Sequence, residues 1–282
     1  FIHHGLYISP DSDTLIYTLA GVNDPERGWG RADETWHTHS TLGQLGIENW
    51  FQIGDKDLAL HLYRNEQRKK GLSLTEITQH IAQKFGVNSC ILPMSDDPVQ
   101  TIIESDIGHL SFQEYFVKHQ SKPCIRNISF NGSTEASLSP ELKTVIRDNG
   151  FKAIIVCPSN PYLSIDPILS IEEIKSFIES ASIPVVAVSP IVDGKALRGP
   201  AAKIMHEMDI PVSVKSIAEH YHPLIDGLVI DHKDKIISSE IQSMGIEVQV
   251  TNTVMNHDSD KIQLAQDVVE FSQMISVKKD SL

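Results

Sequence analysis

The stretch KAIIVCPSNPYLSIDPILSI, residues 152–171, joins a short apolar run to a polar turn and contains no glycine-rich phosphate loop. The unbroken run Ala153–Val156 is typical of a strand that is covered on both faces, as in a parallel sheet. The next residues, IEEIKSFIES, have helical spacing, and Ser170 with Glu173 predicts a capping box at the helix start. A strand followed by a helix is the repeating unit of an α/β protein.

The same alternation continues to the end of the chain. Strands are predicted at Val185–Val188, Leu228–Asp231 and Val248–Thr251. Helices are predicted at Gly199–Met208, Ser213–His222 and Asp258–Ile275. Strands that alternate with helices imply a mostly parallel sheet with right-handed crossovers.

The first half of the chain has a different pattern. Helices are predicted at Asp13–Leu19, Asp55–Lys70 and Leu74–Phe85, the last with a capping box of Ser73 and Glu76. Strands are predicted at Cys90–Pro93, Val99–Glu104 and Cys124–Phe130. We therefore predict one α/β domain over residues 1–282, with a mainly helical segment at 11–88 inserted before the sheet resumes and an alternating half at 139–282.

The composition excludes several classes of protein. The 24 basic and 37 acidic residues give a net charge of −13, which argues against nucleic acid and anionic membrane surfaces as partners. No apolar run is long enough to cross a bilayer. The three cysteines, Cys90, Cys124 and Cys157, lie far apart in apolar surroundings, so we expect reduced core residues and a cytoplasmic protein.

Unusual loops follow three of the predicted strands, at the edge where ligands bind to open parallel sheets. They are CPSNPYLSIDP after 153–156, SPIVDGKALRGP at 189–200 and TNTVM at 251–255. The Ser159 and Asn160 side chains, with free backbone N–H groups at a helix start, can hold phosphate oxygens or a purine edge.

Positive charge and glycine characterise the second of these loops. Lys195 and Arg198 stand beside Gly194 and Gly199, whose lack of a side chain lets the backbone approach an anionic ligand. Turn formation explains any one such loop equally well. Because two neighbouring strands have them, ligand binding is the better interpretation.

Pairs of aspartates begin three segments in the first half of the chain. They are Asp11 and Asp13, Asp55 and Asp57, and Asp96 and Asp97. Helix capping is the ordinary use of such acids and accounts for the second pair. Three acidic junctions beside a phosphorylated ligand would also suit Mg²⁺, which one or two carboxylates hold together with phosphate oxygens, or would orient a nucleophilic hydroxyl.

Histidine and tryptophan give weaker signals. The pairs His37 with His39 and His220 with His222 have the spacing of ligands on a strand, but a zinc site normally brings a clearer set of partners. Trp29, Trp36 and Trp50 could stack on a planar ring, although packing of the helical segment is the favoured role.

Taken as a set, the motifs resemble one family. SPDSDTLIYTLAG, RGWGRADETW, FQIGDKDLALHL, LPMSDDPVQT, FQEYFV, PSNPYLSIDPIL, SPIVDGKALRGPAAKIM and VTNTVM occur in the order found in the 2-phospho-L-lactate transferase family, which acts in coenzyme F(420) biosynthesis. The resemblance covers nearly the whole chain.

The resemblance implies a Rossmann-like three-layer fold and a phosphotransferase. Such an enzyme moves a phosphorylated three-carbon acid from a guanosine-diphosphate-activated donor to the deazaflavin 7,8-didemethyl-8-hydroxy-5-deazariboflavin, and it releases GMP with the help of Mg²⁺. The acid is derived from phospholactate, phosphoenolpyruvate or phosphoglycerate in different members.

The resemblance, together with the acidic pairs described above, assigns residues. Asp13 is expected to contact the deazaflavin and, with Asp11, to be catalytic; Asp11 is also the expected metal ligand in this chain. Gln52, where relatives often carry a basic residue, is expected at the deazaflavin pocket with Asp96 and Asp97. The expected nucleotide-binding residues are Ser159, Asn160, Pro161, Ser164, Ser189, Gly194, Lys195 and Gly199.

Chains of this family begin with a strand, a glycine-rich loop and an acidic segment that carries the main metal ligand, and Phe1 follows directly after that point. A protein that starts at Phe1 is therefore expected to be inactive, and one that carries the preceding residues to be active. A homodimer through the helical segment or a sheet edge is compatible with the sequence. Two other classes stay open: a nucleotide-sugar-binding regulator of the same fold, and a nicotinamide-dependent oxidoreductase, which the missing GxGxxG motif disfavours.

Overall fold

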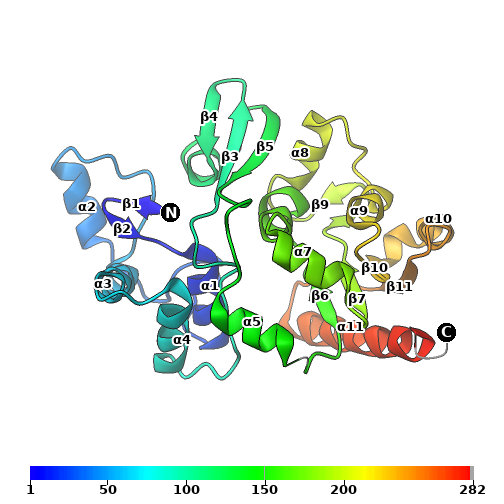
Figure 1. Cartoon of the computed structure of the whole chain (residues 1–282). Coiled ribbons are helices and arrows are strands. Elements are labelled where there is room, and N and C mark those ends of the chain that lie inside the picture. Colours follow the sequence, from blue (N-terminus) through cyan, green and yellow to red (C-terminus); the bar gives the residue numbers. More distant parts are fainter. Residues whose placement is uncertain (149, 280–282) are drawn as a thin grey trace.

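The computed structural model describes residues 1–148 and 150–279 and is built around a four-stranded parallel sheet. Its strands are β6 (Ile154–Val156), β7 (Val185–Val188), β10 (Gly227–Asp231) and β11 (Glu247–Thr251), in the spatial order β11-β10-β7-β6 (Figure 1). All neighbouring pairs are parallel. The four strands predicted after residue 150 are thus confirmed, as is the mostly parallel α/β fold.

Helices cover both faces of this sheet, which gives three layers. Val185 and Ala187 of β7 pack in one core cluster with α8 (Ala201–Glu207) and α9 (Val214–Tyr221), whereas Val186 and Val188 pack on α11 (Asp258–Lys279). Successive side chains of a strand point to opposite faces, so the inner strands β7 and β10 each serve two layers, which explains their unbroken apolar runs. The expectation that Ala153–Val156 is covered on both faces is wrong, because β6 is an edge strand and Ile155 is 38% exposed.

Close packing of α11 on the sheet depends on Gly227 in β10. A Cβ atom at this position would lie 2.6 Å from Cδ1 of Ile275 and 2.7 Å from Cε1 of Phe271. The glycine therefore lets the helix approach the strand.

The connection after β6 differs from the prediction at the start of the next helix. Two short helical turns, η2 (Pro161–Ile165) and α6 (Asp166–Leu169), precede α7 (Glu172–Glu179). Ser170 is the C-cap of α6, and its Oγ donates to the carbonyl of Pro167. The predicted capping box of Ser170 and Glu173 is therefore wrong, because Ser170 ends α6 and does not begin α7.

Residues 1–88 form a second core from helices. The elements are β1 (Ile2–His3), β2 (Leu6–Tyr7), α1 (Pro10–Leu19), α2 (His37–Gln44), α3 (Asp55–Lys69) and α4 (Leu74–Lys84). Ile16 and Tyr17 of α1 pack with Leu60 of α3 and with Ile77 of α4. The capping box of Ser73 and Glu76 is confirmed. Every residue of α2 is exposed or half-buried, so its sequence carried no apolar pattern from which to predict it.

A third unit is an antiparallel sheet of β3 (Gln100–Ser105), β4 (Gly108–Ser111) and β5 (Ile125–Asn131), in the order β4-β3-β5. Two of its strands were predicted, but they pair with each other and not with the parallel sheet. The predicted strand at Cys90–Pro93 is wrong: these residues lead into a link in which Oγ of Ser95 donates to the carbonyl of Ser137 at 2.6 Å. The remaining elements are η1 (Glu114–Lys118), α5 (Pro140–Arg147), β8 (Ile191–Val192), β9 (Lys195–Ala196), η3 (His232–Ile237) and α10 (Ser238–Gln242).

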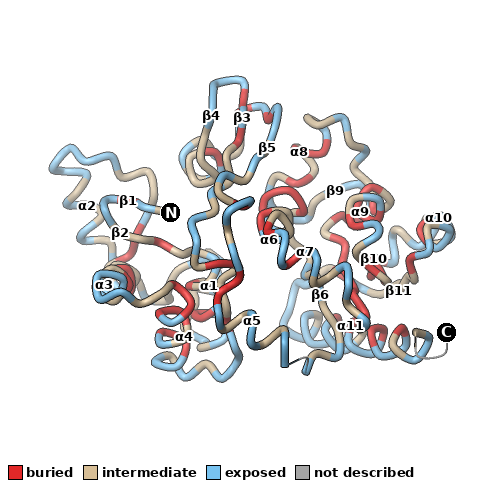
Figure 2. The backbone as a smooth tube through the Cα atoms, viewed as in Figure 1, coloured by how far each residue is buried: buried red, intermediate tan, exposed pale blue. Residues whose placement is uncertain are grey.

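The buried residues lie mainly in two hydrophobic cores, one around the parallel sheet and one among the helices of residues 1–88 (Figure 2). The cysteines are free, as predicted, but Cys90, Cys124 and Cys157 are all exposed and not in the core. Cys157 comes directly after β6 and Cys124 directly before β5, whereas Cys90 lies in the irregular chain between α4 and β3. In the described part of the chain, no helix is both long and apolar enough to span a membrane.

Candidate functional site

The carboxyl ends of the four parallel strands bring the predicted nucleotide loops to one edge of the sheet. Residues 157–160 follow β6 and residues 189–200 follow β7, and these two strands are direct neighbours. Residues 252–255 follow β11. The prediction that the first two loops leave adjacent strands is therefore confirmed.

Asn160 organises the loop after β6. Its Oδ1 accepts hydrogen bonds from the amides of Tyr162, at 3.1 Å, and Leu163, at 3.3 Å, and so caps η2. Its Nδ2 is buried and, among the described residues, has no partner. Ser159 is half-buried and Ser164 exposed. Capping thus occupies the amide oxygen, while the NH₂ group remains able to donate to a ligand.

A short hairpin dominates the loop after β7. Oγ of Ser189 donates to the carbonyl of Ile191 at 3.0 Å and accepts from its amide at 3.1 Å, so this hydroxyl closes a turn. Gly194 has a φ of +67° and Gly199 one of +69°, as backbone turns of this kind require.

The cationic side chains of this loop are open to solvent. Lys195 on β9 and Arg198 are exposed, and neither has an ion-pair partner within residues 1–148 and 150–279. Both are therefore available to an anion at the carboxyl edge.

Asp231 at the end of β10 is a buried acid at this edge of the sheet that the sequence analysis missed. It is 4% exposed, and its Oδ2 accepts from the Thr253 amide at 3.0 Å while Oδ1 accepts from the Lys233 amide at 3.1 Å. It ties the loop after β11 to that after β10. The sequence feature that could have revealed Asp231 is the aspartate at the end of the apolar run GLVID.

The two early aspartates have contrasting surroundings on α1. Asp11 is exposed in the first turn, whereas Asp13 is 4% exposed and forms an ion pair through Oδ1 with Nη2 of Arg64. Burial raises the pKa of Asp13 to about 6, against the lowering effect of the Arg64 charge. Oδ2 of Asp13 is buried and has no hydrogen-bond partner in the described chain.

A polar network on α3 lies behind Asp13. Asp57, His61 and Arg64 lie four and three residues apart, which places them on one face of the helix. Nε2 of His61 is 3.4 Å from Oδ2 of Asp57, and the Tyr17 hydroxyl donates to Oδ1 of Asp57 at 2.6 Å. Burial opposes ionisation of Asp57, but hydrogen bonds from His61 and Tyr17 hold its pKa below the ordinary value. The spacing DKDLALHLYR could have revealed this group.

Asp55 caps a helix, as predicted, but it caps the preceding helix α2 and not α3, which begins at Asp55. It accepts from Oγ1 of Thr35 at 2.6 Å and from the amides of His37 and Thr38 at 3.0 Å, at the start of α2. These bonds, with that of Thr35 foremost, hold the pKa of Asp55 well below its usual range. Asp57, by contrast, does not cap.

Glu34 caps α3 in return. It accepts from the amides of Lys56, at 2.9 Å, and Asp57, at 2.8 Å. Its side chain covers Gly54, where a Cβ would lie 1.9 Å from Cγ of Glu34. Gln52 is exposed in the loop between α2 and α3.

Asp96 and Asp97 have structural partners. Asp96 accepts from the Thr75 amide at 2.7 Å, in the first turn of α4. Asp97 accepts from the amide of Ser137 at 2.9 Å and from its hydroxyl at 3.1 Å. They connect the helical segment to the chain that enters α5, and their contact with a deazaflavin stays a prediction.

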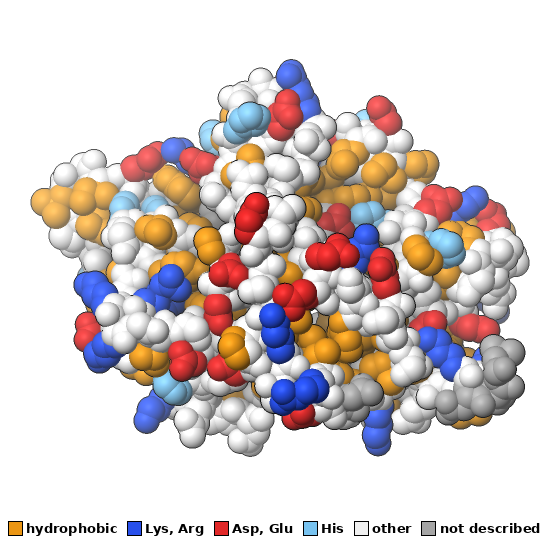
Figure 3. Space-filling model, in the orientation of Figure 1, with side chains coloured by type: hydrophobic (Ala, Val, Ile, Leu, Met, Phe, Trp, Pro, Cys, Tyr) orange, Lys and Arg blue, Asp and Glu red, His pale blue; other side chains and the backbone are white. Residues whose placement is uncertain are grey.

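The early aspartates and the strand-end loops lie in different parts of the molecule. In Figure 1, the helices of residues 1–88 lie on the left and the parallel sheet with its helices on the right. Among the described residues, no hydrogen bond or ion pair joins the two groups. Acidic side chains lie along the middle of this face (Figure 3). A shared crevice lined by both groups stays a prediction.

The histidine pairs do not form a metal site. Residues 1–148 and 150–279 contain no group of three or more His, Cys, Asp or Glu that could hold a metal ion. His220 instead lies 2.8 Å from Asp166, which links α9 to α6.

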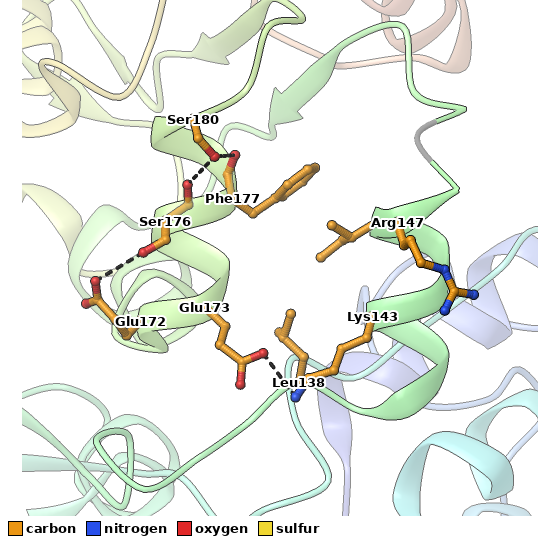
Figure 4. Close-up of a pocket in the computed structure, with 9 residues that line it drawn as sticks. Leu138, Lys143, Arg147, Glu172, Glu173, Ser176, Phe177 and Ser180 are labelled. Carbon is orange, nitrogen blue, oxygen red and sulfur yellow. Dashed lines mark hydrogen bonds and ion pairs between the residues drawn. The ribbon is translucent and has the colours of Figure 1, made fainter.

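An open groove lies between α5 and α7 (Figure 4). Leu138, Ile146 and Phe177 form its apolar surface, and Lys143 pairs with Glu173 at 3.1 Å across it. The residues that line it include none of the predicted site residues.

Comparisons with known proteins agree with this architecture. A family model described as 2-phospho-L-lactate transferase CofD matches residues 2–273. A 2-phospho-L-lactate transferase from Methanopyrus kandleri is 38% identical over 270 residues, which cover 94% of this chain and 84% of the relative. A phosphoenolpyruvate transferase from Mycobacterium leprae is 36% identical over 225 residues, 77% of this chain and 67% of the relative. A crystal structure of a UPF0052 family member from Bacillus halodurans is similar in fold, with a TM-score of 0.55, 13% identity and coverage of 89% of this chain and 81% of that one.

Proposed function

The chain belongs to the 2-phospho-L-lactate transferase family, and from this premise we propose that it transfers a phosphorylated three-carbon acid to 7,8-didemethyl-8-hydroxy-5-deazariboflavin in coenzyme F(420) biosynthesis. The donor is the acid linked to guanosine diphosphate, and GMP is released. The observation that carries the proposal is the match over residues 2–273, with relatives named as transferases of such acids. The relatives' names include both 2-phospho-L-lactate and phosphoenolpyruvate transferases, which supports a 2-phospholactate or enolpyruvyl phosphate unit as the acid, and a phosphoglycerate unit is the third candidate.

The reaction is a phosphoryl-type displacement. The terminal ribityl oxygen of the deazaflavin forms a bond to the phosphorus that carries the acid, and the bond from this phosphorus to the bridging oxygen breaks, so that GMP leaves with that oxygen. Protein groups contribute chiefly by positioning and by neutralising charge. In this proposal Oδ2 of Asp13, which has no partner in the described chain, accepts a hydrogen bond from the attacking hydroxyl and takes up its proton as the bond to phosphorus forms, and the proton then passes to solvent.

The proposed donor site is the carboxyl edge of the sheet. The unpartnered Nδ2 of Asn160 and the exposed charges of Lys195 and Arg198 support it, since each can meet phosphate oxygens or a guanine carbonyl. Ser159, Ser189 and Gly194 shape the two loops around it.

Mg²⁺ is the proposed cofactor. The described residues contain no cluster of three side chains that could bind a metal ion. In this proposal the donor phosphates and water therefore supply most of the ligands of Mg²⁺. Within this chain the exposed Asp11 is the carboxylate that would hold the ion. A bound ion would neutralise the diphosphate charge.

We further propose a cytoplasmic location, which the three free thiols support, because such compartments keep cysteines reduced. We also propose a homodimer.

Product analysis tests the proposed function. The native full-length protein is incubated with the deazaflavin, Mg²⁺ and an equimolar mixture of the three guanosine-diphosphate-linked acids. The products are then identified by mass spectrometry. We expect GMP and one dominant deazaflavin adduct in equal amounts. The variant Asp13→Asn should slow the reaction strongly. Recovery of unchanged deazaflavin with all three donors would contradict the proposal.

A further inference from the structure

A chain of polar contacts inside the helical core begins at the Tyr17 hydroxyl of α1, passes through α3 and ends on Asp13. Nη2 of Arg64 pairs with Oδ1 of Asp13, and Nη1 of the same guanidinium lies 3.0 Å from Nδ1 of His61 and 3.3 Å from the carbonyl of Tyr7. Arg64 and His61 are each 1% exposed. The family comparison and the proposed reaction leave both side chains without a role.

The contacts fix the tautomer of His61. A guanidinium can only donate, so Nδ1 of His61 must be the acceptor and the ring proton lies on Nε2. Nε2 lies 3.4 Å from Oδ2 of Asp57, whose other oxygen accepts from the Tyr17 hydroxyl. Asp57 thus faces the Nε2 side of His61, and the Nδ1 side of the ring accepts from Arg64, so His61 orients the guanidinium from behind.

This arrangement leaves the two oxygens of Asp13 inequivalent. Oδ1 is held by Arg64, whereas Oδ2 is buried, lies 3.9 Å from Nδ1 of His61 and receives no hydrogen bond from the described residues. His61 cannot fill the vacancy, because its Nδ1 carries no proton in the tautomer that Arg64 requires. A buried carboxylate oxygen without a donor is costly, so a donor is expected to arrive with a ligand.

We propose that Arg64 and His61 are positioning residues for Asp13, which hold its Oδ1 and thereby present Oδ2 to the ribityl hydroxyl of the deazaflavin. This inference rests on the proposed function and adds the two residues that set the direction of the acceptor contact. Neither residue touches the substrate.

Arg64→Lys is the first test, because an ammonium cannot bridge Asp13, His61 and Tyr7 in one plane. We expect the KM for the deazaflavin to rise about tenfold or more, with the KM for the donor unchanged. Arg68→Lys is the matched control: Arg68 lies on the same helix, its guanidinium stands 4.3 Å from the centre of the Tyr7 ring, and it does not contact Asp13. The control should stay within about twofold of the native protein.

His61 is tested by replacements that keep one ring nitrogen each. Asn supplies an acceptor near the place of Nδ1, and Gln supplies an amide near the place of Nε2. If orientation of Arg64 matters, His61→Asn should retain the low KM and His61→Leu should lose it, with His61→Gln in between. ¹⁵N NMR of the native protein should show a protonated Nε2 and an unprotonated Nδ1 for His61.

A double-mutant cycle separates positioning from general support of the fold. In an Asp13→Asn background, Arg64→Lys should add less than about twofold to the KM, because the group it positions is already lost. Additive effects, or an Arg64→Lys enzyme with native KM, would overturn the inference while leaving the transferase reaction intact. Thermal unfolding of each variant shows whether it is folded, and deazaflavin fluorescence titration gives the affinity without turnover. A native protein that neither binds nor converts the deazaflavin would overturn the proposed function and the inference together.

Discussion

At the scale of single residues, the most informative feature is the almost fully buried carboxyl group of Asp13. Asp13 is buried against Arg64, and removal of one partner from such a pair leaves the other charge uncompensated. The sequence placed Asp13 in the first turn of a helix but could not show its burial, because the partner lies 51 residues away.

The pKa of Asp13 predicts a pH dependence of stability. Its folded value of about 6 exceeds the ordinary 3.8, so the folded state holds more protons between these values and the stability contributed by Asp13 falls as the pH rises through this window. Asp13→Asn loses a constant amount of stability by leaving Arg64 unpaired, but its unfolding free energy should move in the variant's favour relative to the native protein by up to about 3 kcal/mol from pH 4 to pH 7. Urea unfolding at several pH values measures this. If the unfolding free energies of the native protein and of Asp13→Asn changed in parallel with pH, this prediction would be contradicted.

Asn160 offers a test of the donor loop. Asn160→Asp keeps the oxygen that caps η2 but replaces the unpartnered NH₂ with a negative oxygen. We expect at least about tenfold weaker GDP binding by calorimetry, since a carboxylate repels phosphate, and some loss of stability, since a charge is placed where the NH₂ group is buried. Asn160→Ala is the companion, and it should also lose about 1 kcal/mol of stability with the cap. Native GDP affinity in Asn160→Asp would remove Asn160 from the donor site.

At the scale of elements, prediction succeeded where one helix or strand contains its own signal. The apolar runs of β7 and β10 and the capping box of α4 are local patterns, and the structure has them. The failures depend on neighbours: Ser170 belongs to α6, and Asp55 caps α2 and not its own helix. A contact between segments that are distant in sequence leaves no periodic trace.

Loss of the Asp55 cap should release the start of α2. This helix buries no residue fully, so its first amides depend on the carboxylate of Asp55. In Asp55→Ala, we expect hydrogen exchange at His37 and Thr38 to accelerate while the amides of α4 stay protected. Asp55→Asn, which keeps one acceptor oxygen, should be intermediate. Unchanged exchange at both amides would contradict the assignment.

Packing of α11 on the sheet gives a second prediction at this scale. Gly227→Ala places a methyl group against Ile275 and Phe271, and overpacking of this kind costs about 1–3 kcal/mol. Ile275→Val removes the Cδ1 atom at 2.6 Å, so the double variant should recover part of the loss. Urea unfolding of the two single variants and the double variant measures this coupling, and strictly additive losses would count against a direct clash.

At the scale of the whole molecule, the parallel α/β fold was predictable because its strands and helices alternate along the chain. The candidate site was only partly predictable. The strand-end loops follow from the topology, since parallel strands end at one edge. The network behind Asp13 and the tie made by Asp231 both depend on tertiary packing.

The two parts of the proposed site should bind independently. The acceptor residues belong to the core of residues 1–88 and the donor residues to the parallel sheet, so GDP should not displace the deazaflavin. Titration of deazaflavin fluorescence at saturating GDP should give an affinity within about threefold of that without GDP. Mutual exclusion of the two ligands would show that the sites overlap.

The helix α11 has a consequence for synthesis on the ribosome. It covers Val186, Val188 and Val229, yet it is translated after all four strands of the parallel sheet. Until residues beyond 258 leave the exit tunnel, one apolar side of the nascent sheet has no cover, and nascent chains in that state are prone to associate with one another. Polypeptides stalled before α11 should therefore be the ones that chaperones retain.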